Sequence, residues 1–92
     1  MTEVPSAELL ARYRQHDASA AEALFQRYVE RLTQLARSRL SRKLAARVDA
    51  EDVVLSAFRS FFLLARGAEV SLRQSGDLWR LLVLITLRKV YR

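Results

Sequence analysis

Apolar residues recur every three or four positions along most of the chain, which is the spacing of one face of an α-helix. The pattern predicts four helices, over about residues 7–15, 19–41, 50–66 and 77–91. Their apolar stripes hold, in order, Leu9, Leu10 and Tyr13; Leu24, Phe25, Tyr28, Leu32, Leu35, Ala36 and Leu40; Val54, Ala57, Phe58, Phe61 and Ala65; and Leu78, Leu81, Leu82 and Ile85. The long β-branched alternations typical of strands are missing.

The third and fourth predicted helices are the most apolar. Val53, Phe62 and Leu64 widen the stripe of helix 50–66, so that helix is expected to be largely buried. The fourth helix carries a second apolar side, made of Trp79, Val83, Thr86 and Val90, and a helix apolar almost all round is a central one. We therefore expect one domain over residues 1–92, a compact all-α bundle of about four helices whose core comes from the last three.

Residues that can cap a helix precede each predicted helix. The candidate N-caps are Ser6, Ser19, Asp49, and either Ser75 or Asp77, because their side-chain oxygens can accept from unpaired backbone N–H groups. Ser19 and Glu22 also fit the capping-box spacing. Gly67 is a typical helix stop, residues 42–48 read as a connection without a pattern, and residues 68–76 read as a loop.

The net charge of +6 is unevenly distributed. Residues 31–48 hold six basic and no acidic side chains, and residues 66–92 hold six basic and two acidic ones. The segment between them starts with three acids, Asp49, Glu51 and Asp52. Two basic blocks therefore flank one acidic helix start. Basic blocks suit a polyanion such as nucleic acid, although a merely solvated surface would look the same.

Several classes of site are excluded by composition. The chain has no cysteine and one histidine, His16, so thiolate and histidine-cluster metal sites are excluded and no cofactor is expected. The polar N-terminus does not resemble a signal peptide, and no apolar run approaches the ~20 residues that cross a bilayer. We therefore expect a cytoplasmic protein that has no membrane partner.

Catalysis is not indicated. The acids at positions 49, 51 and 52 lie in a helix first turn, where capping and the helix dipole account for them better than a metal or acid–base role does. No glycine-rich phosphate loop and no nucleophile beside a base is present, and His16 reads as a turn residue between two helices. The chain is predicted to be a binding protein and not an enzyme, with no small-molecule substrate.

Nucleic-acid binding is better supported. Trp79 and Tyr91 lie among Arg73, Arg80, Arg88, Lys89 and Arg92. Aromatic faces stack on unpaired bases, and Arg and Lys neutralise phosphates. Trp79 is equally a candidate core residue, because the helix around it is so apolar, and the pattern leaves both interpretations open.

Three motifs resemble region 2 of sigma-70 family sigma factors, in the correct order. Asp49-Ala50-Glu51-Asp52-Val53-Val54-Leu55-Ser56-Ala57-Phe58 is similar to the D-x-E-D motif of region 2.2, and Asp17 through Tyr28 is similar to region 2.1. Leu78 to Arg92 resembles regions 2.3 and 2.4. The likeness covers about Leu9 to Arg92 and is closest to the extracytoplasmic-function (ECF) type, with Ile85-Thr86-Leu87-Arg88-Lys89 similar to a planctomycete-like sub-group.

The resemblance implies a function in transcription initiation and two sets of binding residues. It implies that the 2.2 helix binds the clamp helices of the polymerase β′ subunit through Asp49, Glu51, Asp52, Leu55, Ser56 and Arg59. It implies that the melted non-template strand of the promoter minus-ten element, with a base extruded into a pocket of loop 67–77, is bound by Arg66, Arg73, Ser75, Trp79, Arg80, Arg88, Lys89 and Arg92. An anti-sigma factor is the implied regulatory partner.

The sequence departs from the family pattern at three places. Leu55 and Ser56 replace the usual Gln and Glu, so two polar contacts with polymerase are lost, and Leu55 would offer an apolar contact instead. The Asn of the last motif is replaced near Arg88, which weakens the expectation of base-specific readout. Region 4, the second domain of the family, is absent, so we expect one domain of a longer factor or a truncated reading frame.

Two rival interpretations remain at this point. One is a helical nucleic-acid binder without sequence preference and without a polymerase partner, for which the acidic start of helix 50–66 would have no use. The other is a structural or adaptor bundle that binds no DNA even at low salt. A third and more distant one lays the basic, apolar segment Leu78–Arg92 on a membrane surface.

Overall fold

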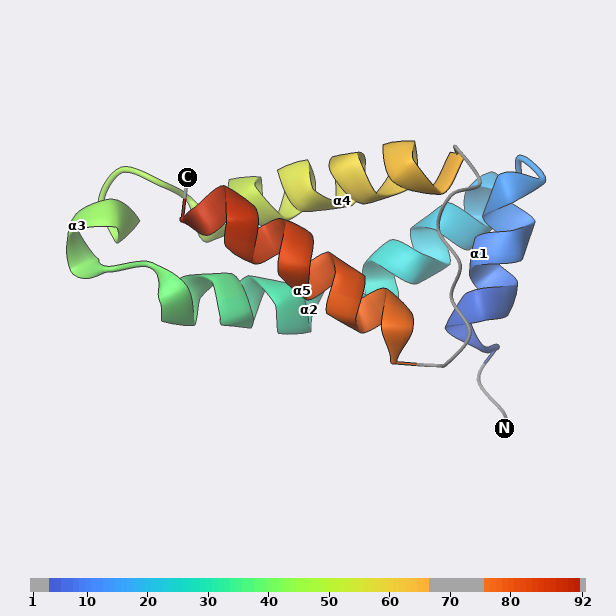
Figure 1. The fold of residues 1–92 in the computed structure, drawn as a ribbon, viewed down its shortest axis with the longest axis horizontal. Coiled ribbons are helices and arrows are strands. Elements are labelled where there is room, and N and C mark those ends of the chain that lie inside the picture. The colour runs from blue at the N-terminus through green and yellow to red at the C-terminus, as the bar shows by residue number, and fades with distance from the viewer. Residues whose placement is uncertain (1–3, 67–75, 92) are drawn as a thin grey trace.

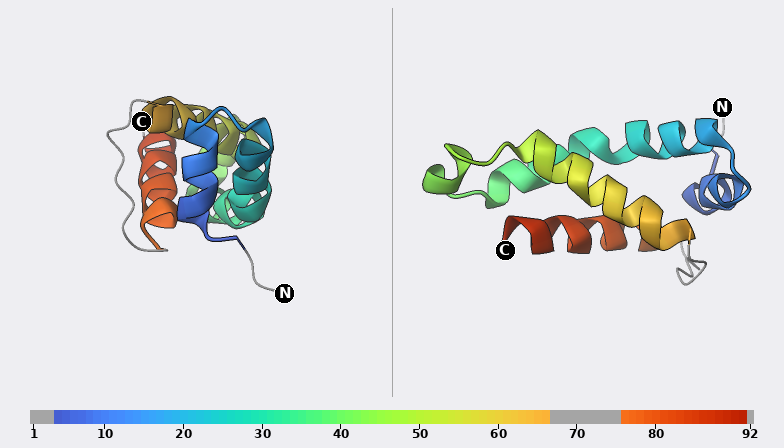
Figure 2. Two further views of the ribbon diagram at one scale, coloured as in Figure 1. Left: turned by 90° about the vertical axis from the view of Figure 1, so that its right-hand side faces the viewer. Right: turned by 90° about the horizontal axis from the view of Figure 1, so that it is seen from above.

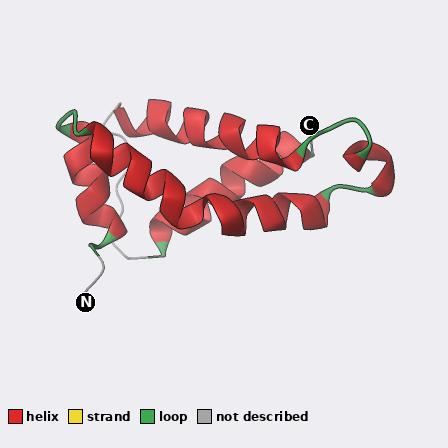
Figure 3. Ribbon diagram, turned by 180° about the vertical axis from the view of Figure 1, so that it is seen from behind, coloured by secondary structure: helices red, strands yellow, loops and turns green. Residues whose placement is uncertain are grey.

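Three long helices lie side by side and a fourth packs across one end. The structure, a computed structural model, describes residues 4–66 and 76–91. The long helices are α2 (Ala18–Arg39), α4 (Ala50–Arg66) and α5 (Asp77–Val90). Helix α1 (Ser6–Arg14) crosses one end of them, and the short α3 (Arg42–Ala45) lies at the opposite end (Figure 1). The described residues contain helices and loops only, which confirms the predicted all-α class (Figure 3).

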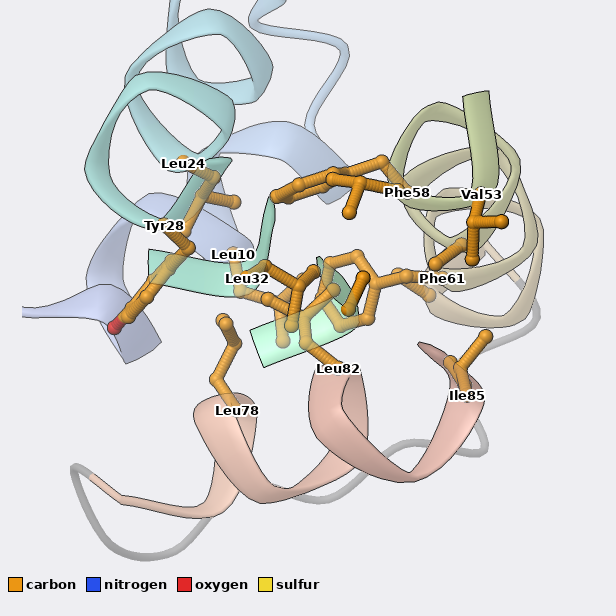
Figure 4. Packing of buried hydrophobic residues seen from close by; sticks show 14 of the residues in the cluster. Leu10, Leu24, Tyr28, Leu32, Val53, Phe58, Phe61, Leu78, Leu82 and Ile85 are labelled. Atoms are coloured by element: carbon orange, nitrogen blue, oxygen red, sulfur yellow. The ribbon is translucent and has the colours of Figure 1, made fainter. Parts of the chain in front are cut away.

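The core lies where α2, α4 and α5 face one another. Leu78 and Leu82 of α5 point towards Phe61 of α4 and Leu32 of α2 (Figure 4). All four side chains are fully buried, and each contributes about 1.5–3 kcal/mol through burial. Viewed along the bundle, the three long helices surround this core and α1 closes the near end (Figure 2). The prediction that the core comes from the last three of the four predicted helices, which are α2, α4 and α5, is therefore confirmed.

The chain forms five helices within the described residues, where four were expected. The additional helix is α3, a single turn within residues 42–48, where the sequence pattern predicts a connection without a helix. Ser41 starts it by accepting a hydrogen bond from the Leu44 backbone N–H at 3.2 Å. One turn is too short to display an apolar period, which is why the pattern could not reveal it.

Two of the predicted N-caps are wrong. Ser6 is already the first residue of α1, after Pro5, and its buried hydroxyl instead shares a hydrogen bond with the Tyr28 hydroxyl. For α2 the cap is Asp17, whose carboxylate accepts from the backbone N–H of Ser19 at 3.0 Å and from its hydroxyl at 2.6 Å. A carboxylate upstream of Ser19 can accept both donors, so it displaces the predicted box.

The other two predicted helix starts had different outcomes. Asp49 does cap α4, because its Oδ1 accepts from the Glu51 backbone N–H at 3.0 Å. Helix α5 starts after Gly76 without a side-chain cap, and Asp77 is its first residue. Ser75 and the predicted stop Gly67 lie outside the described residues, although α4 does end at Arg66.

Helix α5 is not a central helix, contrary to the expectation from its composition. Leu84 is 48 % exposed and Tyr91 is 65 % exposed, on the side that also carries exposed Arg80 and Arg88. In a bundle this small each helix has neighbours on one side only, so even a very apolar helix keeps a face in water. Leu64 of α4 is also wrongly placed in the core by the sequence pattern, since it is 48 % exposed.

Candidate protein- and nucleic-acid-binding surfaces

The side of α4 that points away from the core carries an exposed stripe. Asp52, Leu55 and Arg59 follow at spacings of three and four, and all three are exposed, Leu55 by 53 %. Ser56 beside them is half-buried. Leu63, one turn after Arg59 and 62 % exposed, continues the stripe, and the sequence analysis did not single it out. Leucines held in water on a helix that also has a complete core face are available to a partner.

The three acids at the start of α4 have three different environments. The side chain of Asp49 is used as the N-cap. Glu51 forms an ion pair with Arg37 of α2, with 2.9 Å between Oε1 and Nη2 and both side chains exposed. Asp52 has no ion pair or hydrogen bond to any other side chain in the part of the chain that the structure describes. The structure therefore leaves Asp52 as the acid most available to a basic partner.

A groove runs between α2 and α4 beside this stripe. It has a volume of about 420 Å³, an apolar floor that includes Phe25, Val29 and Leu55, and a charged rim that includes Glu51 and Arg37. The Phe25 ring lies 4.9 Å from that of Phe58, so the floor continues the core. The α2 half of the groove was missed by the sequence analysis, although Phe25 and Val29 lie one helical turn apart and could have indicated it.

The residues predicted to bind DNA do not form one cluster. Arg80 and Arg88 share the exposed side of α5, at a spacing of two turns, whereas Lys89 is half-buried on another side. Arg66 lies at the end of α4, where its Nε donates to the Tyr13 hydroxyl at 3.0 Å. Arg73, Ser75 and Arg92, with the loop expected to hold an extruded base, lie outside the described residues.

Trp79 lies at the edge of the core. Its ring stacks on Tyr28, with 5.9 Å between centroids and 26° between planes, and Arg31 Cζ lies 4.3 Å from its centroid. The ring is half-buried and packs against the core cluster. Trp79 is thus a residue at the edge of the core that also contacts an exposed arginine, and its binding of DNA stays a prediction.

A hydrogen-bond network holds Tyr28 in place beneath Trp79. The Tyr28 hydroxyl bonds to Ser6 Oγ at the start of α1. Arg27 Nη1 donates to the Val4 carbonyl at 2.6 Å and to Ser6 Oγ at 3.3 Å. In Figure 4 the Tyr28 ring reaches from the core to its edge. The network joins the start of α1 to α2, and the Tyr28 ring contacts Trp79 of α5, so the position of Trp79 depends on contacts far apart in the sequence.

The opposite end of α4 is fastened to α1. The Tyr13 hydroxyl donates to the Phe62 carbonyl at 3.3 Å, and Arg14 Nε donates to the Ala65 carbonyl at 3.1 Å. Ala65 is among the last four residues of α4, whose carbonyls have no intrahelical donor, so the bond from Arg14 satisfies one of them. His16, at φ 68°, makes the turn after α1, as expected for a turn residue. A hollow of about 620 Å³ borders these residues. The hydrogen bonds between α1 and α4 account for the positions of its side chains.

The described residues contain no group of three or more His, Cys, Asp or Glu side chains that could hold a metal ion. None of the described helices combines the length and the apolar composition that a membrane crossing needs.

Comparison with known proteins gives one match. A family model described as "ECF sigma factor" matches residues 1–92. Searches of curated proteins and of solved structures each found no match to the chain. The family description does not divide the family further, so the planctomycete-like sub-group stays a prediction.

Proposed function

The chain belongs to the ECF sigma factor family, whose members are transcription initiation factors, and from that premise we propose that α4 binds core RNA polymerase and α5 binds promoter DNA. Polymerase and promoter DNA are the partners that this family implies. The proposal is more specific: the clamp helices of the β′ subunit lie along α4, and the melted non-template strand of the minus-ten element lies along α5. Such a factor works by binding in the cytoplasm and catalyses no reaction itself.

The observation that carries the proposal is the exposed stripe Asp52, Leu55 and Arg59 on α4. A helix of a partner that lies on this stripe meets a leucine flanked by an acid and a base. The groove beside it offers Phe25 and Val29 as a further apolar surface. Charges at the rim speed association and select the partner, whereas the buried apolar contact holds the complex.

The departures from the family pattern agree with an interface that has an apolar centre and a charged rim. Leu55, where the family usually has Gln, is 53 % exposed and borders the groove, so it is placed to supply an apolar contact in exchange for a polar one. Of the acids, Asp52 is available at once, whereas Glu51 has to exchange Arg37 for a partner's base. An exposed ion pair is worth roughly 0–1 kcal/mol, so this exchange costs little. An anti-sigma factor that covers the same stripe would block polymerase.

The proposed contact with promoter DNA is supported by the residues on the exposed side of α5. Arg80 and Arg88 lie about 12 Å apart along the helix, from a rise of about 1.5 Å per residue, which allows each to meet a different phosphate of one strand. Leu84 and Tyr91 lie exposed on the same side, and an exposed aromatic ring can stack on an unpaired base. Trp79 borders this surface from the α2 side.

Charge reversal at Asp52 tests the polymerase contact. Asp52→Arg is expected to weaken retention by immobilised core polymerase about five- to tenfold at low salt, and by less as salt screens the charges. The control is Glu8→Arg, which makes the same charge change at an exposed position of α1 and also breaks the exposed Glu8–Arg12 ion pair. Circular dichroism checks that both variants keep their helices.

Each outcome separates the candidate functions. If core polymerase retained the Asp52→Arg variant and the wild type equally, the polymerase interface proposed on α4 would be wrong. A wild-type chain that is not retained by polymerase but binds random single strands tightly would be a general nucleic-acid binder. A chain that binds neither partner, even at low salt, would be an adaptor bundle.

A further inference from the structure

One side of α2 faces α5 and carries a cation stacked on an aromatic ring. Arg31 Cζ lies 4.3 Å from the Trp79 ring centroid, within the range of a cation–π contact. The opposite side of α2 carries the groove with Glu30 and Arg37. Helix α2 therefore borders the proposed polymerase surface on one side and the Trp79 edge of α5 on the other.

The donors of Arg31 are available to an anion. Guanidinium N–H groups lie in the plane of the group, so a ring stacked on its face leaves the edges open. Arg31 is exposed and has no hydrogen bond or ion pair to any residue in the ranges 4–66 and 76–91. Arg27, one turn earlier, differs because its Nη1 is already bound to Val4 and Ser6.

The residues that contact the Arg31–Trp79 pair from the core side are held in place by packing. Tyr28, only 7 % exposed, stacks on Trp79 and is itself held by Ser6. A guanidinium that lies over a ring held in this way has already lost part of its conformational freedom, so binding an anion costs it less entropy. The Arg31–Trp79 pair is thus prearranged by three helices before any ligand arrives.

The surrounding charges favour a phosphate. Arg80, the next residue after Trp79, is exposed and adds a second cation. Glu30, the neighbour of Arg31 in the chain, points to the groove on the other side of α2. Two exposed arginines, one on α2 and one on α5, offer donors for the phosphates of a single strand.

We propose that Arg31 is a further strand-binding residue, which donates to a backbone phosphate while its contact with Trp79 keeps the guanidinium in place. The inference rests on the proposed binding of a melted strand and extends that surface from α5 onto α2. It assigns a nucleic-acid contact to a helix for which the sequence motifs implied none.

Trp79 is the only tryptophan of the chain, so its fluorescence reports on this site directly. The experiment titrates short single-stranded DNA of mixed sequence into the wild type and into Arg31→Gln, Arg31→Lys and Arg42→Gln variants at several salt concentrations. Arg42 is an exposed cation on α3, at the other end of the molecule (Figure 1). Arg31→Lys keeps the charge but lacks the planar, stacking group.

Arg31→Gln is expected to bind about fivefold more weakly at low salt and to lower the salt slope by about one, with Arg31→Lys in between and Arg42→Gln close to the wild type. Quenching of Trp79 on binding is expected for the wild type. Equal affinity and slope for Arg31→Gln and the wild type, or equal losses for Arg31→Gln and Arg42→Gln, would overturn this inference and leave the binding to α5 standing. A wild-type chain that binds no strand overturns both.

Discussion

At the scale of single residues, hydrogen-bonding side chains are used differently from what their sequence positions suggested. Ser6 and Ser19 look like caps, but Ser6 bonds to Tyr28 and Ser19 donates to Asp17. The pKa of Asp17 is lowered below its ordinary 3.8, first by the hydrogen bond from the Ser19 side chain and then by backbone N–H groups. Each of these bonds stabilises the ionised carboxylate at the positive end of α2.

The lowered pKa of Asp17 predicts how stability depends on pH. The cap contributes stability above 3.8, and that contribution is lost as the pH falls through the lower pKa of the folded state. Ser19→Ala removes the largest cause, so the pKa of Asp17 should rise towards 3.8, and the stability lost between pH 3.8 and the pKa of the folded state should become smaller. Titration of the Asp17 carboxyl carbon by NMR measures this directly.

The control for this change is Ser38→Ala. Ser38 lies on the same helix and its hydroxyl donates to the Leu35 carbonyl, far from Asp17. It should leave the Asp17 titration unchanged. An Asp17 pKa that stays low in Ser19→Ala would mean that the backbone N–H groups and the charge of Arg12 account for it.

At the scale of elements, the two sides of α4 lie in different environments. Its buried side holds Phe58 and Phe61 in the core, and its exposed side holds Leu55 and Leu63 in water. Sequence periodicity found the buried side, because packing requires it to be apolar at helical spacing. It did not reveal that Leu63 is exposed, because an apolar residue next to a core stripe reads as part of the core until the neighbours are known, whereas the family resemblance had already placed Leu55 on the binding side.

This division predicts very different costs for two truncations on α4. Phe58→Ala removes a ring that is 3 % exposed and should lower the free energy of unfolding by about 3–5 kcal/mol. Leu63→Ala, at a position 62 % exposed, should change it by no more than about 0.5 kcal/mol. Urea unfolding followed by circular dichroism gives both values. Similar losses for the two variants would contradict the orientation of α4.

At the scale of the whole molecule, α2, α4 and α5 bring two surfaces of different character close together. The acid-capped start of α4 belongs to an exposed stripe with an apolar centre, whereas α5 exposes arginines and an aromatic ring. A transcription initiation factor of this family has to hold a protein and a nucleic acid at once. The proposed protein surface on α4 and the proposed nucleic-acid surface on α5 consist of different residues, so the proposal predicts that the two partners do not compete.

Salt dependence tests the α5 face. Replacing Arg80 and Arg88 by Ala should weaken binding of single-stranded DNA and lower the salt slope by about two, because each phosphate contact releases counterions. The control pair, Arg42→Ala with Lys43→Ala on α3, removes the same charge at exposed positions elsewhere. Fluorescence anisotropy across salt concentrations gives the slopes. An unaltered slope in the α5 variant would show that these arginines do not contact phosphate.

The sequence by itself determined the helical class, the buried sides of the helices and the family, because helical periodicity and motif order are local properties of the chain. It also placed Asp52 and Leu55 together, since residues three apart on a helix share a side. The tertiary structure alone decided that Arg37 pairs with Glu51, that Arg31 lies on Trp79, and that α5 keeps an exposed side. These depend on which helices become neighbours, and the energy of that packing is set by contacts between residues far apart in the chain.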